Sequence, residues 1–154
     1  MKKVRLNYPD IAPAGPTYNR AVRAGQWLFI SGCTAKGTPI QGGPVIEQLR
    51  VTLDRIRRIV AAEGGRPADI VRLTTYVTDI GEWRALTPER EALLRECFQG
   101  EFPTNTLVEI GALAEPGLDV EIEATALLDG PARRSRPRPG RARSAARRRG
   151  RARR

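Results

Sequence analysis

The chain has 154 residues, 40% of them hydrophobic, which suits a single globular domain. Its formal charge of +10 is concentrated at the carboxyl-terminal end, because residues 131–154 hold 12 of the 27 basic residues and none of the 17 acidic ones. The chain contains no histidine, which excludes Ser–His and Cys–His nucleophiles and a paired-histidine ribonuclease mechanism.

This composition predicts a folded domain over residues 1–130 and a disordered arginine-rich tail over residues 131–154. Apart from alanine, the tail contains only Arg, Pro, Gly and Ser, and it cannot bury enough apolar surface to offset its chain entropy. Such a tail can contact phosphate backbones of nucleic acid without reading their sequence. The tail can also be an extension without function, and this second interpretation is favoured. We expect nucleic-acid contact, if any, through the tail alone.

The two cysteines, Cys33 and Cys97, are isolated and lack the spacing of a zinc site or a disulfide scaffold. We therefore expect no metal and no cofactor. No apolar stretch typical of a signal peptide follows Met1, and the longest strongly apolar run covers only residues 27–30, far fewer than the roughly 20 residues of a membrane helix. These features predict a cytoplasmic protein without a membrane partner.

The first predicted element is a β-hairpin, formed by residues 20–23 and 27–31 around a turn that contains Gly25. A glycine-rich loop follows. Apolar residues at spacings of three and four then predict an amphipathic helix over residues 45–63, which ends at a Gly-Gly pair.

The second half of the domain begins with residues 70–78, which are rich in β-branched side chains and predict a strand. A second helix is expected over residues 87–98, with Thr87 as N-cap and a proline in its first turn. Residues 106–113 and 120–127 are predicted as two final strands, joined by a Glu-Pro-Gly turn. This order indicates an α+β fold with an antiparallel-rich sheet, both helices on one face and an opposite face that needs a partner.

Six short segments of the chain form a pattern by their order and spacing: RAV at 20–22, ISG at 30–32, the helix with Gln48, TTYVTD at 74–79, FPTNTLVEI at 102–110 and VEIEA at 120–124. This pattern resembles the Rid (reactive intermediate deaminase) family, also called the YjgF or L-PSP endoribonuclease-like family, over roughly residues 12 to 128. The resemblance implies a chorismate-mutase-like fold and a homotrimer with a pocket at each subunit interface. It also implies hydrolysis of reactive enamines and imines, such as 2-aminoacrylate, to 2-oxo acids and ammonia without a cofactor.

The resemblance also implies roles for five residues. Glu121 matches the glutamate that orders the attacking water, and Gly32 matches a glycine whose backbone approaches the ligand. Tyr18 matches the pocket tyrosine, although one extra residue precedes it, and Thr87 is placed in the pocket. Asn105 stands where the family has an arginine that holds the substrate carboxylate. Because an amide offers only neutral hydrogen bonds, this exchange implies a weakened anchor and argues against classical 2-aminoacrylate deaminase activity.

The residue patterns alone leave alternatives open. Glu121 and Glu123 share one face of their strand by its period of two, which fits a solvated face as well as a site. Asn105 is as compatible with a turn at a strand entrance as with ligand contact. Arg20 is the one other cation that could approach the pocket, and a surface role is at least as compatible with its position. Cys33 is expected to be a buried filler.

The leading hypothesis is a trimeric protein that acts on a small enamine, imine or related metabolite by adding water at an interface pocket. The alternatives are a small-molecule-binding or regulatory trimer without turnover and, ranked last, an RNA-binding protein or endoribonuclease.

Overall fold

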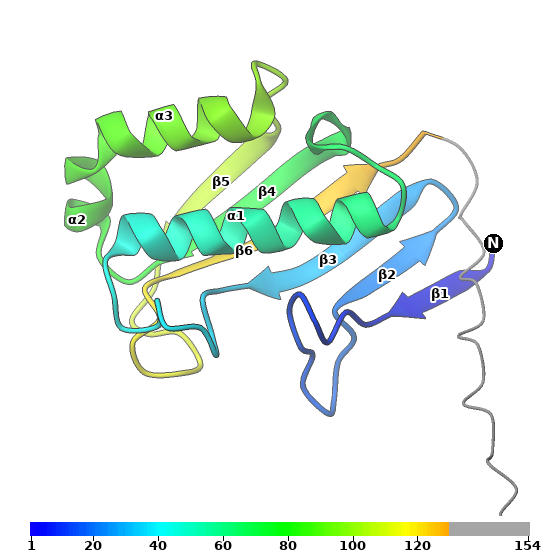
Figure 1. Ribbon diagram of the computed structural model, residues 1–154, viewed down its shortest axis with the longest axis horizontal. Helices are drawn as coiled ribbons and strands as arrows, with labels where there is room; N and C mark the ends of the chain where they lie inside the picture. The colour runs from blue at the N-terminus through cyan, green and yellow to red at the C-terminus, as the bar shows by residue number, and fades with distance from the viewer. Residues whose placement is uncertain (130–154) are drawn as a thin grey trace, which may run out of the picture.

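The computed structural model describes residues 1–129, so the arginine-rich tail predicted at residues 131–154 lies outside the described residues. Six strands form one sheet in the order β1-β2-β3-β6-β4-β5 (Figure 1). All neighbouring strands are antiparallel except β4 and β5, which run parallel. The strands are β1 (Lys3–Leu6), β2 (Ala21–Ala24), β3 (Trp27–Cys33), β4 (Ile70–Val77), β5 (Thr104–Glu109) and β6 (Val120–Leu127).

Two long helices, α1 (Val45–Ala62) and α3 (Thr87–Phe98), lie on the same face of this sheet (Figure 1). A short helix, α2 (Ile80–Ala85), precedes α3, and a 3-10 helix, η1 (Pro67–Asp69), precedes β4. The α+β class, the antiparallel-rich sheet and the placement of both long helices on one face are therefore confirmed. Within residues 1–129, no helix has the length and apolar character needed to cross a membrane.

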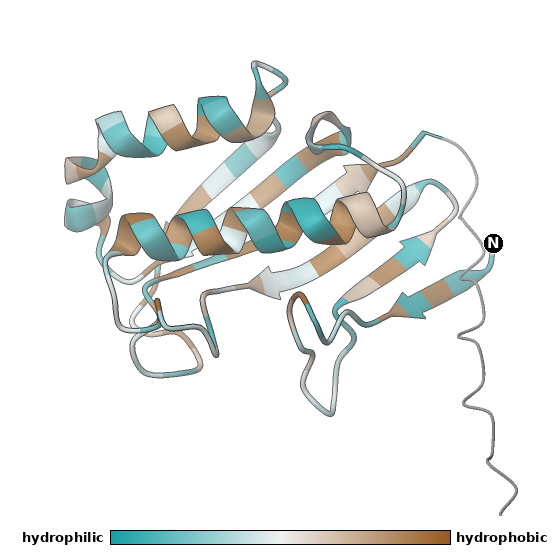
Figure 2. Ribbon diagram, viewed as in Figure 1, coloured by the Kyte–Doolittle hydropathy of each residue, from teal (hydrophilic) through white to brown (hydrophobic). Residues whose placement is uncertain are grey.

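The core lies between α1 and the sheet, as the sequence periods require. On α1 the buried side chains recur every three or four residues, and Figure 2 shows hydrophobic and hydrophilic bands alternating along the helix. On β6 the inward residues alternate with outward ones, so that Ile122 is buried while Glu121 and Glu123 share the opposite face. The period-two prediction for the two carboxylates is therefore confirmed.

Three features of the fold differ from the predicted elements. Strand β1 and helix α2 were not predicted, because both are too short to carry a clear periodic signal. β1 has four residues, of which two are apolar, and α2 has six residues. β5 starts at Thr104, two residues before the predicted strand, and it pairs with β4. The last two strands are therefore not neighbours, because β6 inserts between β3 and β4.

The predicted N-cap of the second helix is wrong. The N-cap position is taken by Leu86, which also ends α2, and Thr87 is the first helical residue. The Thr87 hydroxyl donates to the carbonyl oxygen of Arg84 at 2.7 Å, so it caps no amide of α3. The cause is the unpredicted α2, whose own N-cap is Asp79: its carboxylate accepts from the amide of Glu82 at 2.9 Å.

The face of the sheet opposite the helices is open in a single chain. Cross-strand pairing places Trp27 beside Leu127 on this face, and Phe29 is 49% exposed. The rings of Trp27 and Phe29 stack with their centroids 6.3 Å apart. Glu121 belongs to the same outward face of β6, at the opposite end of the strand from Leu127. The exposed aromatic side chains and the carboxylate thus share one unpartnered surface.

Candidate functional site

A cavity of about 210 Å³ lies where β3 ends, between the loops that precede β2, follow β3 and precede β6. This is smaller than the ~300–1,000 Å³ of sites for drug-sized ligands, so it suits a small metabolite. The cavity brings together three of the predicted site residues, Tyr18, Gly32 and Glu121. Its other polar side chains are Arg20, Cys33, Thr34, Lys36, Arg55 and Glu115.

Glu121 lies directly against the backbone of Gly32. A Cβ atom at Gly32 would be 1.8 Å from Oε1 of Glu121 and 2.6 Å from its Cδ, so only glycine leaves room for the carboxylate. The close approach occurs at a β-bulge, because the register of β3 against β6 shifts between Ile30 and Cys33. Bulges re-aim side chains and are common beside active sites. Here the bulge and the glycine together determine where the carboxylate sits.

The environment of Glu121 makes its carboxyl group more basic. Burial raises its pKa, the nearby Arg20 guanidinium opposes the rise, and the negative charge of Glu123 adds to it. A carboxylate with a raised pKa takes a proton from water more readily than a solvated one. Glu121 is therefore the candidate general base of this cavity.

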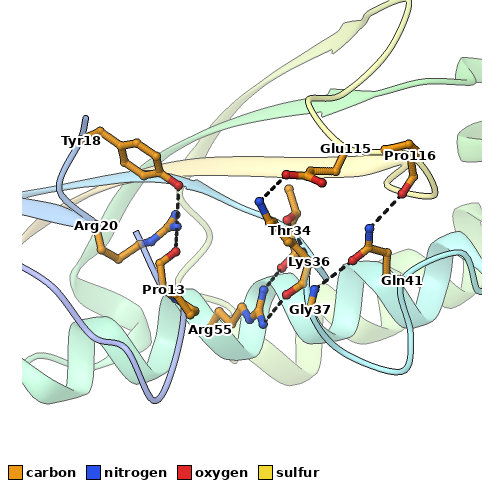
Figure 3. A network of polar contacts seen from close by, with 10 residues as sticks. All are labelled: Pro13, Tyr18, Arg20, Thr34, Lys36, Gly37, Gln41, Arg55, Glu115 and Pro116. Carbon is orange, nitrogen blue, oxygen red and sulfur yellow. Dashed lines mark hydrogen bonds and ion pairs between the residues drawn. The ribbon is translucent and has the colours of Figure 1, made fainter. Parts of the chain in front are cut away.

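Arg20 is buried, with 5% of its surface exposed, and it holds the wall of the cavity (Figure 3). Its guanidinium donates to the carbonyl oxygens of Ala12 at 3.0 Å, Pro13 at 2.6 Å and Gly32 at 2.5 Å. These bonds join the loop before β2 to the bulge that carries the glycine. Arg20 is thus a buried positioning residue of the site, rather than a surface one.

Tyr18 lies over Arg20 at the mouth of the cavity (Figure 3). Its hydroxyl oxygen accepts a hydrogen bond from Nη2 of Arg20 at 3.1 Å, and the guanidinium carbon lies 5.3 Å from the ring centroid. Because the hydroxyl oxygen already accepts from Arg20, its own hydrogen can be donated to a bound ligand.

Arg55 reaches from α1 to the loop after β3 (Figure 3). Its guanidinium donates to the carbonyl oxygens of Thr34 at 2.5 Å and Lys36 at 2.9 Å. The ammonium group of Lys36 in turn pairs with the carboxylate of Glu115, across the rim of the cavity.

Cys33 is 1% exposed, and burial raises the pKa of its thiol to about 11 despite the opposing charges of Arg20 and Arg55. A neutral buried thiol is a poor nucleophile. The prediction of a buried filler is therefore confirmed.

Two of the predicted site residues do not join this cavity within one chain. The side-chain oxygen of Asn105 accepts from the Thr75 hydroxyl at 2.9 Å, which places it on the helix-bearing side of the sheet. Glu121 faces the other side, paired with Tyr76. Thr87 lies at the junction of α2 and α3, where its hydroxyl bonds within its own segment. A ligand role for Asn105 or Thr87 stays a prediction.

A larger groove of about 560 Å³ lies between α1 and α3. Its charged side chains pair with one another at the surface, as Arg50 does with Glu96 at 3.7 Å and Arg58 with Asp54 at 3.7 Å. It holds none of the predicted site residues. The smaller cavity is the better candidate because the half-buried carboxylate of Glu121 and the ring of Tyr18 both line it.

Sequence reasoning missed Arg55 and Lys36, and it left the place of Arg20 open. The signal for Arg55 is its spacing, because Gln48, Thr52 and Arg55 recur at four and three on the buried stripe of α1. A buried guanidinium needs hydrogen-bond partners, and for Arg55 two main-chain carbonyls provide them. Lys36 lies in an irregular loop and has no periodic signal.

The fold and the cavity define a small α+β protein with a glutamate carboxylate in a pocket beside an open sheet face. The family model described as Endoribonuclease L-PSP matches residues 10–128, and the chain belongs to this family, also known as the Rid or YjgF family.

The relatives and solved structures agree with this membership. A RutC family protein of Pyrococcus horikoshii is 31% identical over 82% of this chain and 98% of its own, and a 2-iminobutanoate/2-iminopropanoate deaminase of Capra hircus is 33% identical over 75% and 84%. The crystal structure of a Mycobacterium tuberculosis member of the YjgF/YER057c/UK114 family has a TM-score of 0.66 and 34% identity, covering 82% of this chain and 100% of that one.

Proposed function

We propose that the protein hydrolyses small imines, or enamines after their conversion to imines, to oxo compounds and ammonia in the cavity that contains Glu121. The observation that carries the proposal is the Glu121 carboxylate, packed on Gly32 with a raised pKa inside a cavity of small-metabolite size. The relative from Capra hircus, named as a 2-iminobutanoate/2-iminopropanoate deaminase, supports this choice of reaction.

The proposed reaction begins with a water molecule between Glu121 and the imine carbon. The Glu121 carboxylate takes a proton from the water while the water oxygen bonds to the imine carbon, and the electron pair of the C=N bond moves to nitrogen. The protonated Glu121 returns this proton to nitrogen, which gives a tetrahedral intermediate with one hydroxyl and one amino group on the carbon. Glu121 then takes the hydroxyl proton and passes it to nitrogen while the C=O bond forms and the C–N bond breaks, so that nitrogen leaves as ammonia. The net change is imine plus water to oxo compound plus ammonia.

Two neighbouring residues have supporting roles in this proposal. Tyr18, whose hydroxyl oxygen is held in place by Arg20, donates its hydroxyl hydrogen to the substrate and orients it. Arg20 holds the carbonyl of Gly32, and with it the bulge on which Glu121 rests. Its charge also limits the rise in the Glu121 pKa, so that the carboxyl group can still act as a base.

We also propose that the active unit is a homotrimer in which the open sheet face is covered by a second copy of the chain. Trp27, Phe29 and Leu127 are each 40% or more exposed on this face, and exposed apolar patches of this kind mark association surfaces. Because Glu121 lies on the same face of β6, a second copy would border the cavity and shield it from water.

The test is ammonia release from freshly generated 2-iminobutanoate, measured with the full chain against the rate in buffer. We expect acceleration by the native protein, and a fall of about 10²- to 10⁴-fold in kcat/KM for Glu121→Gln, the usual contribution of a general base. Glu123→Gln is the matched control, since it removes the next outward carboxylate on β6 and retains activity. Equal rates for the native protein and Glu121→Gln would refute the mechanism, and saturable binding without any product would favour a regulatory trimer.

A further inference from the structure

Three cationic side chains line the cavity: Arg20, Arg55 and Lys36. The two arginines are buried, and within the described residues their hydrogen bonds go to main-chain carbonyls and to the Tyr18 hydroxyl. They cannot turn toward a ligand without leaving buried carbonyl groups unpaired. Lys36 differs, because its side chain is 60% exposed and its partner is the carboxylate of Glu115, which is 41% exposed.

The backbone of Lys36 is held firmly although its side chain is exposed. Its carbonyl oxygen accepts from Arg55 at 2.9 Å, and its amide donates to the Thr34 hydroxyl at 3.1 Å (Figure 3). The main chain of Lys36 is therefore fixed at the rim of the cavity, and only the flexible side chain that carries the ammonium group is free to move.

The rim does not depend on the Lys36–Glu115 ion pair. The loop after β3 and the loop before β6 are also joined by Nε2 of Gln41, which donates to the carbonyl oxygen of Pro116 at 2.9 Å (Figure 3). The amide of Gly42 donates to the carbonyl oxygen of Gly117 at 2.7 Å. Exposed ion pairs contribute little to stability, so this one can open while the loops stay in place.

We propose that Lys36 is the specificity residue that binds a carboxylate of the substrate, which takes the place of Glu115 as the partner of the ammonium group. The inference rests on the proposed imine hydrolysis and adds the side chain that recognises a substrate whose carboxylate lies next to the imine carbon. Lys36 and Glu121 line the same cavity of about 210 Å³, so a small molecule can meet both. In the free protein the carboxylate of Glu115 pairs with the ammonium group of Lys36, and it leaves this position when the substrate binds.

The test uses stable product analogues, so that it needs no turnover. Calorimetric titration of the full chain compares 2-oxobutanoate with its neutral amide, 2-oxobutanamide. We expect Lys36→Met to weaken binding of 2-oxobutanoate at least about tenfold, as expected for a charge-assisted hydrogen bond, with 2-oxobutanamide changed by less than about twofold. Glu115→Gln should strengthen binding of 2-oxobutanoate, because the competing carboxylate is gone. Lys2→Met, at an exposed lysine outside the cavity, is the control and leaves both affinities unchanged.

Unchanged 2-oxobutanoate affinity in Lys36→Met would overturn the inference, as would an equal loss for the acid and the amide. Failure of the native protein to bind 2-oxobutanoate would overturn it too. These outcomes separate the two proposals. Ammonia release together with 2-oxobutanoate binding that does not depend on Lys36 would refute only the role of Lys36. Binding that depends on Lys36 without ammonia release would refute the hydrolysis and support the role of Lys36.

Discussion

Gly32→Ala tests whether the position of the Glu121 carboxylate controls catalysis. The added Cβ would lie 1.8 Å from Oε1, and ordinary contact begins at 3.4 Å, so the oxygen must move by about 1.6 Å. Misplacement of a catalytic group by about 1 Å can lower the rate about 10²-fold. The cost to folding should be small, because the displaced atoms are the end of a flexible side chain, and a strained rotamer costs about 1 kcal/mol.

The assay is ammonia release from 2-iminobutanoate, run beside urea unfolding of the same samples. We expect kcat/KM to fall about 100-fold or more in Gly32→Ala, with the free energy of unfolding changed by about 1 kcal/mol. Gly111→Ala is the control, since its Cβ would meet open space. If Gly32→Ala keeps native activity while Glu121→Gln loses it, the contact between the carboxylate and the glycine does not matter for catalysis.

Three further predictions concern stability and assembly. Because the pKa of the Glu121 carboxyl group is raised in the folded state, the folded protein binds more protons than the unfolded chain above the ordinary value of 4.5, and its stability falls as the pH rises. Glu121→Gln removes this loss, so its free energy of unfolding in urea titrations should increase relative to that of the native protein from pH 4 to 7. Arg20→Met leaves three carbonyls without donors and should lose about 3 kcal/mol of unfolding free energy, measured likewise. Light scattering should give about three times 17.0 kDa for the native chain and a monomer for Phe29→Asp; an unchanged mass would contradict the interface.

The main elements of the fold could be predicted because their sequence periods are long. The helix at residues 45–63 and the strand at 70–78 carry enough apolar repeats to determine type and face, and both are confirmed with bounds within one residue. Pairing could not be predicted in the same way. Which strand lies beside β4 depends on the whole sheet, and only the structure shows β6 inserted between β3 and β4.

The candidate site could be predicted only in part. Glu121 and Gly32 belong to strand segments whose order matches the family, and the structure brings them into contact. Arg20 and Arg55 act through main-chain carbonyls, which every residue carries, so the sequence cannot show which carbonyls they bind. Asn105 faces the helix-bearing side within one chain, away from the Glu121 carboxylate, so its ligand role stays a prediction.

The most direct test of the central claim is a crystal structure of the full chain with bound 2-oxobutanoate. We predict the ligand in the cavity beside Gly32, with its oxo carbon facing the Glu121 carboxylate and its own carboxylate bonded to Lys36. A ligand held elsewhere, out of reach of Glu121, would contradict the proposed site and its chemistry.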